Sequence, residues 1–205
     1  MPSKLLDQVC LRVPTIADVP ELARMHVASW HATYRGVLAD ESLDAITPEG
    51  FEQFHARNFA PADQGGGIAD PQRVFLVAVE CANSSRIAGF CRGGPSRAQS
   101  PRGDVLPAAV QNAHSAELYA IYLRPEYFGS GLGRMLLAPV LDGLRERGHR
   151  SLCVWALTGN TIGRRFYERL GGKLVGESVF TLDSRTYPQV AYGWEHIPAV
   201  SHKQD

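Results

Sequence analysis

Runs of apolar residues predict seven β-strands along the chain. Each run contains many residues of high β-propensity, and short polar or glycine-containing segments separate the runs. The strands are expected at 10–14, 73–81, 85–92, 116–123, 151–157, 173–182 and 189–197. The second and third are joined by a short polar turn, which is typical of a hairpin.

Apolar residues spaced three and four positions apart predict helices between the strands. The first helix follows Thr15 and Asp18, which fit a capping box, and the second opens at Thr47 and Pro48. Further helices are expected from Leu132 to Gly148 and over 160–170. The order of strands and helices predicts an α/β fold with a mixed, mostly antiparallel sheet and helices on both faces.

The composition favours one globular domain that acts on small ligands. The chain has 205 residues, of which 44% are hydrophobic, and 21 basic residues balance 21 acidic ones. No net positive charge is present to attract nucleic acid or an anionic membrane, so neither is an expected partner. The N-terminal segment has no apolar core of signal-peptide length and no segment approaches a membrane span, so we expect a cytoplasmic protein.

Four cysteines stand far apart in or beside apolar runs. Cys10, Cys81, Cys91 and Cys153 have no C-x-x-C spacing, and we interpret them as reduced core residues. Residues 93–115 form a Pro- and Gly-rich segment that is too long for a tight connection. Such a segment is either mobile or part of a site.

The stretch RPEYFGSGLGRMLL, at 124–137, carries three glycines on alternate positions before a predicted helix. The dinucleotide fingerprint fails because Arg134 occupies the place of its third glycine, and the phosphate loop G-x-x-x-x-G-K-[ST] is absent. A bare backbone turn that enters a helix N-terminus favours an anion such as pyrophosphate. A flexible turn whose glycines only permit positive φ is the alternative.

Two runs resemble the GCN5-related N-acetyltransferase (GNAT) family. They are ELYAIYLRPEYFGSGLGRMLL at 117–137 and NTIGRRFYERLGG at 160–172, and the first helix, MHVASWHATYRGVL, resembles a bacterial branch of that family. The resemblance implies a GNAT fold in one domain over 1–198, with a tail at 199–205. It also implies direct transfer of an acetyl group from acetyl-CoA to a primary amine of a small molecule or peptide, in a ternary complex without a metal.

Two alternatives on the same fold remain open: a catalytically silent acyl-CoA sensor and a protein-interaction module. Turnover with an amine distinguishes the enzyme from both. The acceptor amine, the acyl-chain preference and a homodimer also remain open.

The resemblance implies a set of acetyl-CoA contacts. Gly131 and Gly133 match the glycines of the family's acetyl-CoA loop, whereas Phe128 stands where Gln or Arg is usual. Backbone groups of the strand 116–123 would pair with the pantetheine arm. The implied cofactor-binding residues are Ile121, Tyr122, Leu123, Gly129, Ser130, Gly131, Leu132, Gly133, Arg134, Asn160, Gly163 and Tyr167.

Acetyl transfer from a thioester to an amine benefits from an acid and a base. By resemblance, Tyr167 is the acid that protonates the leaving sulfur, and a buried core aromatic is the alternative. Glu117 stands where several family members carry a base, but a solvated carboxylate or a structural ion pair is equally consistent with the sequence.

Aromatic residues are candidates for the acceptor pocket. Trp30 and Tyr34 lie one turn apart on the first helix, and with Tyr119 they could form the wall of an amine site, although core packing is the stronger interpretation for Trp30. His26 and His31 are five residues apart, which is wrong for one helical face, so no metal site is expected.

Overall fold

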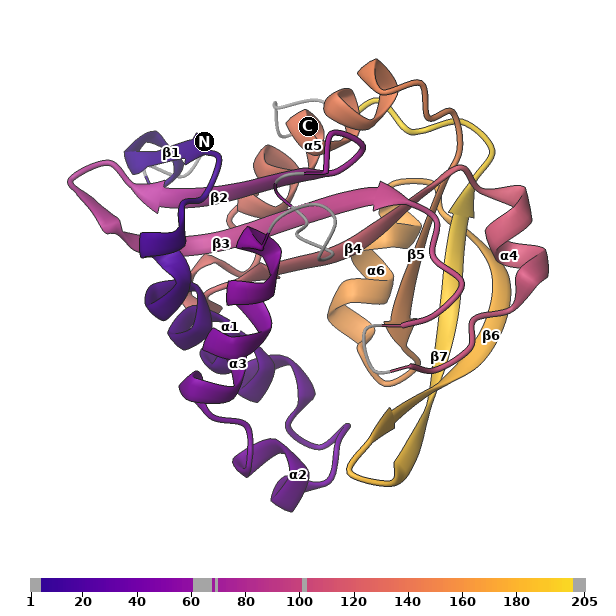
Figure 1. Ribbon diagram of the computed structural model, residues 1–205, viewed down its shortest axis with the longest axis horizontal. Coiled ribbons are helices and arrows are strands. Elements are labelled where there is room, and N and C mark those ends of the chain that lie inside the picture. The colour runs from indigo at the N-terminus through magenta and orange to yellow at the C-terminus, as the bar shows by residue number, and fades with distance from the viewer. Residues whose placement is uncertain (1–4, 61–67, 69, 101–102, 201–205) are drawn as a thin grey trace.

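The computed structural model describes residues 5–60, 68, 70–100 and 103–200 (Figure 1). Residues 61–67, 69 and 101–102 and the end of the predicted tail lie outside these residues. No described helix is long and apolar enough to cross a membrane. The predicted boundary at residue 198, the cytoplasmic location and the oligomeric state stay predictions.

Seven strands form a single sheet in the order β1-β2-β3-β4-β5-β7-β6. Their bounds are Val9–Arg12 (β1), Val74–Glu80 (β2), Asn83–Pro95 (β3), Ala116–Leu123 (β4), Leu152–Leu157 (β5), Lys173–Leu182 (β6) and Arg185–Trp194 (β7). Neighbours are antiparallel except β4 and β5, which are parallel. The predicted strands are therefore confirmed, although β7 begins and ends earlier than expected.

The helices include the four that periodicity predicts and two short ones that it missed. Their bounds are Val19–Tyr34 (α1), Asp40–Asp44 (α2), Pro48–Ala56 (α3), Ala108–Ala113 (α4), Leu132–Glu146 (α5) and Thr161–Arg169 (α6). The helices α2 and α4 have five and six residues, too few to show a helical period in the sequence.

The expected capping residues fix the starts of the early helices. The backbone N–H of Thr15 donates to the Asp18 carboxylate at 2.6 Å, completing a capping box before α1. The Thr47 hydroxyl accepts from the N–H of Gly50 at 3.3 Å at the start of α3. These bonds satisfy donors that a helix leaves open at its first turn.

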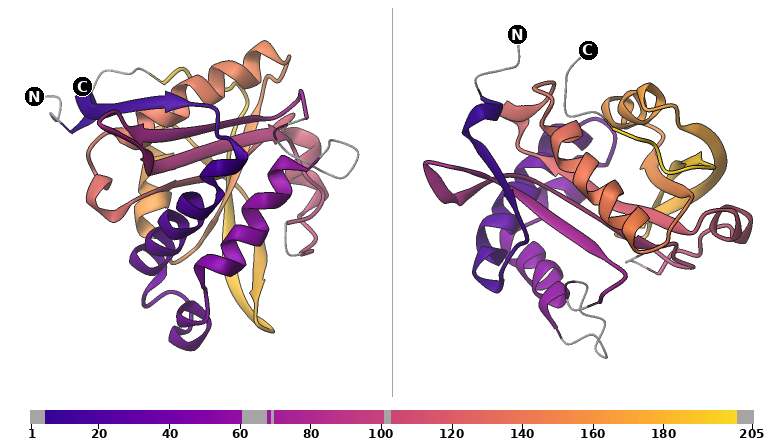
Figure 2. Two further views of the ribbon diagram at one scale, coloured as in Figure 1. Left: turned by 60° about the vertical axis from the view of Figure 1, so that its left-hand side comes forward. Right: turned by 90° about the horizontal axis from the view of Figure 1, so that it is seen from above.

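Helices cover both faces of the sheet, as predicted (Figure 2). One face packs against α1 and α3, and α5 lies on the other face across β2, β3 and β4. The apolar side of α5 enters the largest buried cluster, which also holds Tyr167 of α6 and side chains of β7. Aromatic rings from α1 and α3 form a second cluster on the opposite face.

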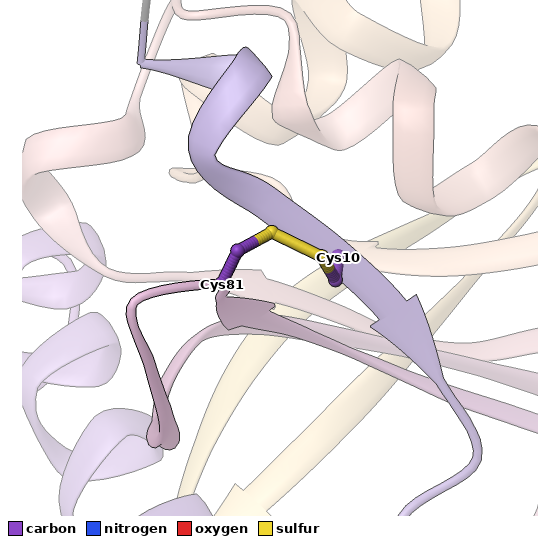
Figure 3. The surroundings of a disulfide bond; sticks show 2 residues. All are labelled: Cys10 and Cys81. Atoms are coloured by element: carbon purple, nitrogen blue, oxygen red, sulfur yellow. A yellow bond between two sulfur atoms is a disulfide. The ribbon is translucent and has the colours of Figure 1, made fainter.

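The prediction of four reduced core cysteines is wrong for two of them. Cys10 and Cys81 are exposed and form a disulfide, with their Cα atoms 5.6 Å apart (Figure 3). Antiparallel pairing places Cys10 opposite Val79, and the N–H of Cys81 donates to Gln8 at 2.7 Å. This register joins residues 71 positions apart, so spacing in the sequence could not indicate the pair. Cys91 and Cys153 are free and buried, as predicted.

Thiol titration tests this pairing. Protein purified without reductant and unfolded in denaturant should show two reactive thiols, from Cys91 and Cys153, and four after reduction. The double variant Cys10→Ser/Cys81→Ser should lose about 2–4 kcal/mol of unfolding free energy, because the bridge restricts the unfolded chain. Four reactive thiols before reduction would contradict the disulfide.

Candidate active site

The sheet opens between β4 and β5. Only three residue pairs join these strands, from Ala116 with Leu152 to Leu118 with Val154. The strands then diverge, and residues 119–123 of β4 have no partner on the β5 side. In Figure 1 the strands β1 to β4 run in a different direction from β5, β6 and β7. Backbone N–H and C=O groups along this edge of β4 are therefore available to an extended ligand.

A bulge in β4 lies where the strands begin to separate. Arg92 of β3 faces Ala120 and the next residue, Gly93, faces Leu118, so Tyr119 has no opposite residue. One extra residue bends a strand and increases its local twist. The bulged residue, Tyr119, therefore lies directly after Leu118, which forms the last residue pair between β4 and β5.

A cavity of about 890 Å³ occupies the opening. Its lining includes most of the site residues that the sequence indicated: Trp30, Tyr34, Glu117, Tyr119, Ile121, Tyr122, Leu123, Gly129, Gly131, Gly133, Arg134, Asn160, Gly163 and Tyr167. Ser130 and Leu132 are the exceptions. The Ser130 hydroxyl is turned to the Tyr127 carbonyl at 2.7 Å, and the Leu132 side chain is fully buried in the core.

The glycine loop has the conformation that its sequence requires. Gly129 and Gly131 have φ of +73° and +96°, in the region that favours glycine, and Gly131 is the N-cap of α5. The N–H groups of Gly131 and Gly133 have no acceptor among the described residues. A Cβ on Gly133 would only make ordinary contact with Phe166 at 3.5 Å. The loop therefore presents free donors at the positive end of a helix, beside Arg134.

Asn160 closes the opposite side of the gap, at the end of β5. Its amide oxygen accepts from the N–H of Gly163 at 2.9 Å and so caps α6. A Cβ on Gly163 would lie 2.7 Å from the Asn160 amide nitrogen, so glycine leaves room for this cap. The cap places α6, and with it Tyr167, along the cavity.

Tyr167 is 7% exposed, and its ring lies within 6.5 Å of the rings of Phe166, Tyr192 and Trp194. No hydrogen-bond partner for its hydroxyl is found within the described part of the chain. Burial raises the pKa of Tyr167 well above its ordinary value, and nearby Tyr122 adds to the effect. The phenol is therefore fully protonated at neutral pH and borders the cavity as a donor.

Glu117 is 2% exposed and is bound by Arg97 on both carboxylate oxygens. The backbone N–H and Nε of Arg97 donate to Oε2 at 3.2 Å, and Nη2 donates to Oε1 at 2.5 Å. These bonds hold Arg97, two residues after the end of β3, against the sheet. The structural ion pair is thus the role that the geometry supports, and the prediction of a base stays a prediction.

The aromatic residues predicted for the acceptor site all line the cavity, and the rings of Trp30 and Tyr34 are in contact. Trp30 and Tyr34 are each 7% exposed, and the Tyr34 hydroxyl lies 3.1 Å from that of Tyr122. The hydroxyl of Tyr119 donates to the Pro95 carbonyl at 2.6 Å, and the Arg97 guanidinium lies 4.1 Å from the centre of its ring. Burial raises the pKa of Tyr119 to about 12, against the opposing charge of Arg97. Contact with an acceptor stays a prediction for all three.

A hydrogen-bonded chain of rings lies behind Trp30. The Trp30 indole N–H donates to Nε2 of His26 at 2.8 Å, and Nδ1 of His26 lies 3.1 Å from Nε2 of His55. An indole only donates, so His26 accepts on Nε2 and donates from Nδ1. Burial, with the charge of Arg92, lowers the pKa of His55 to about 3, so this chain is neutral. No group of three or more metal-ligating side chains occurs among the described residues.

Sequence reasoning missed four lining residues that carry charge: Arg57, Arg92, Arg97 and Arg169. Arg97 belongs to the segment 93–115 that was expected to be mobile or part of a site, and Ser100 and Leu106 of the same segment also line the cavity. Arg92 could have been found from the sequence, because it is a charged residue at the end of an otherwise apolar stretch of the predicted strand 85–92.

The family model described as "Acetyltransferase (GNAT) family" matches residues 30–172, about two thirds of the chain. The chain belongs to this family. An uncharacterized N-acetyltransferase of Bacillus subtilis, YuaI, is 27% identical over 193 residues, which cover 94% of this chain and 96% of that protein. The GNAT chain described here is thus an acetyltransferase.

Solved structures agree with the fold. The PaiA N-acetyltransferase of Thermoplasma acidophilum in complex with coenzyme A has a TM-score of 0.63 at 20% identity, covering 88% of this chain and 97% of that one. A phosphinothricin acetyltransferase of Sinorhizobium meliloti in complex with acetyl-CoA has a TM-score of 0.62 at 16% sequence identity. The match covers 96% of this chain and 92% of that one. The predicted GNAT fold is confirmed.

Reversal of the charge at Arg134 tests the anion site. Arg134→Glu should weaken acetyl-CoA binding at least roughly tenfold, because a carboxylate would face the phosphates. The same carboxylate lies in the first turn of α5, where it favours the helix by about 0.3–1 kcal/mol, so thermal stability without ligand should not fall. Titration calorimetry and thermal unfolding measure the two effects.

Arg165→Glu is the matched control. Arg165 is exposed on α6 and does not line the cavity, so this variant makes the same charge change outside the site. Equal affinities for acetyl-CoA in both variants would contradict the prediction that Arg134 and its loop bind acetyl-CoA.

A double-mutant cycle tests the role of Glu117. Glu117→Gln and Arg97→Gln should each destabilise the protein, and the double variant should lose less than the sum, with a coupling of about 0.5–3 kcal/mol. The pH dependence of kcat/KM should be unaltered in Glu117→Gln. A selective loss of activity at low pH, without coupling, would instead support the base.

Proposed function

We propose that this chain transfers the acetyl group of acetyl-CoA directly to a primary amine of a small molecule or peptide while both are bound. The observation that carries the proposal is the opened edge of β4, residues 119–123, with a glycine loop at one end and Tyr167 beside it. A ligand that bears an amide-containing arm and a pyrophosphate matches these features.

Two groups of residues would bind two parts of this ligand, the pantetheine arm and the pyrophosphate. Backbone groups of Ile121 and Leu123 would pair with the amides of the pantetheine arm, as an added strand does. The free N–H groups of Gly131 and Gly133 and the Arg134 side chain would hold the pyrophosphate. The remaining residues of the loop, including Phe128, would contribute backbone and apolar contact.

Tyr167 would act at the sulfur. In the transfer, the amine nitrogen bonds to the acetyl carbon, the carbon–sulfur bond breaks with its electron pair on sulfur, and the Tyr167 hydroxyl supplies a proton to that sulfur. Its raised pKa keeps the proton in place until charge develops there.

Loss of the amine proton requires a separate group. Glu117 is the one carboxylate among the described residues that line the cavity, and Arg97 occupies both of its oxygens. His26 uses both ring nitrogens for Trp30 and His55. We therefore propose that the acceptor enters as the neutral amine or loses its proton through water, with Glu117 orienting Arg97.

Replacement of Tyr167 by Phe tests the proposal. The ring and its packing remain, so acetyl-CoA affinity should be kept while kcat falls by roughly 10²–10⁴-fold, with the lower end expected because a thiolate can leave unaided. Thiol release with an accepted amine measures kcat, and acetyl-CoA affinity is measured in the same preparation.

Tyr192→Phe is the control. Tyr192 belongs to the same aromatic cluster, but its hydroxyl donates to Glu168 at 2.6 Å and does not line the cavity. Unchanged kcat in Tyr167→Phe would leave Tyr167 as a contact residue. Tight acetyl-CoA binding without turnover on any amine would favour the silent sensor, and absent binding would favour the interaction module.

A further inference from the structure

Arg92 is a half-buried cation whose charge no carboxylate neutralises among the described residues. It lies on the central strand β3, lines the cavity and has one hydrogen bond, from Nη1 to the Asn58 amide oxygen at 2.6 Å. Its guanidinium also lies 5.0 Å from the centre of the Phe54 ring. An arginine has five N–H donors, and the buried Nε of Arg92 has no partner within the part of the chain that the structure describes. Such a charge away from water is costly unless something pairs with it.

The surroundings of Arg92 hold it in place but leave its charge available. Asn58 and Phe54 orient the guanidinium plane without cancelling its charge. Burial, together with the charges of Arg97 and Arg73, lowers the pKa of Arg92 to about 10, so the side chain remains a cation at neutral pH. Neighbouring cations therefore converge on this part of the cavity.

The other charges at the acceptor end leave a net positive surface. Glu117 is neutralised by Arg97, whereas Arg57, exposed on the turn after α3, lines the cavity without a carboxylate partner in the described chain. A cationic acceptor such as a polyamine would meet repulsion here and no free carboxylate.

Arg92 also lies near the reacting end of the cavity. It faces Ala120 across the β3–β4 ladder, next to the bulge at Tyr119 where the opened edge of β4 begins. An acceptor whose amine reaches the acetyl group at this edge has its other end close to the guanidinium.

We propose that the acceptor is a small amine that carries a carboxylate, and that Arg92 binds this carboxylate through its unused N–H donors. The inference rests on the proposed acetyl transfer and names the substrate class of the same site. A guanidinium binds a carboxylate or a phosphonate in a bidentate geometry, so the experiment must separate these two anions.

A matched series of acceptors tests the proposal by thiol release from acetyl-CoA. For chains of two to six carbons, the series compares the ω-amino acid with the ω-aminoalkylphosphonate, the alkylamine and the diamine. The amino acid should exceed the alkylamine of its length by roughly 10- to 100-fold in kcat/KM, the range of a charge-assisted hydrogen bond, and the diamine should be poorest. A preference for the diamine or the alkylamine would overturn the proposal, and a preference for the phosphonate would overturn the choice of carboxylate.

Variants at Arg92 identify the residue responsible. Arg92→Gln should reduce the ratio of amino acid to alkylamine at least tenfold, and Arg92→Lys should restore part of it, while acetyl-CoA binding is kept. Arg165→Gln, outside the cavity, should leave the ratio unchanged. Equal loss on all acceptors in Arg92→Gln would show a scaffolding role and overturn the assignment.

Binding measurements keep the proposal falsifiable when turnover is low. With coenzyme A saturating, the preferred amino acid should raise the thermal unfolding midpoint of the wild-type protein and not of Arg92→Gln, because a ligand of the folded state stabilises it. Absence of this stabilisation for every amino acid of the series would overturn the substrate class. Failure of coenzyme A itself to bind would instead overturn the proposed function.

Discussion

The separation of β4 and β5 is the constraint on which the site depends. A continuous sheet satisfies its backbone groups internally, whereas here the pairing stops after Leu118 and Val154 and leaves one edge of β4 open. Unpaired backbone groups are costly when they are buried without water. The opening is therefore stable only because the cavity admits solvent, or a ligand that replaces the missing strand. The bulge at Tyr119 turns the strand at this point.

The separation of β4 and β5 also positions the two loops of the site, which are the segments that follow these strands. Because β4 and β5 are parallel, their carboxyl ends lie at one end of the sheet, and the segments that follow them meet across the gap. The segment after β4 supplies the glycines and the start of α5, and the segment after β5 supplies the Asn160 cap and α6. The glycine turn and the Asn160 cap are thus placed on the two sides of the gap by topology, and the helix starts fix their direction.

Much of this arrangement could be predicted from the sequence, because it depends on local signals. Apolar runs indicated the strands, and the glycines and the Asn160 position indicated the two turns at the cavity. Features that depend on register could not be predicted. The Cys10–Cys81 bridge and the Glu117–Arg97 pair each join segments that meet only when strands align. The short helices α2 and α4 carry too few apolar residues for a period.

Burial fixes the charge states of His55 and Arg92, which lie near the proposed acceptor end of the cavity. His55 has a pKa of about 3 and Arg92 one of about 10, and desolvation is the main cause that lowers each of them. Neither group changes its charge between about pH 4 and pH 9, since each stays at least about one unit from its pKa. The hydrogen bond from Trp30 further commits His26 to a neutral tautomer beside them. The charge of these two groups is therefore constant over this range, and under the proposed acetyl transfer any change of activity with pH arises from the acceptor amine or from the groups that move its proton.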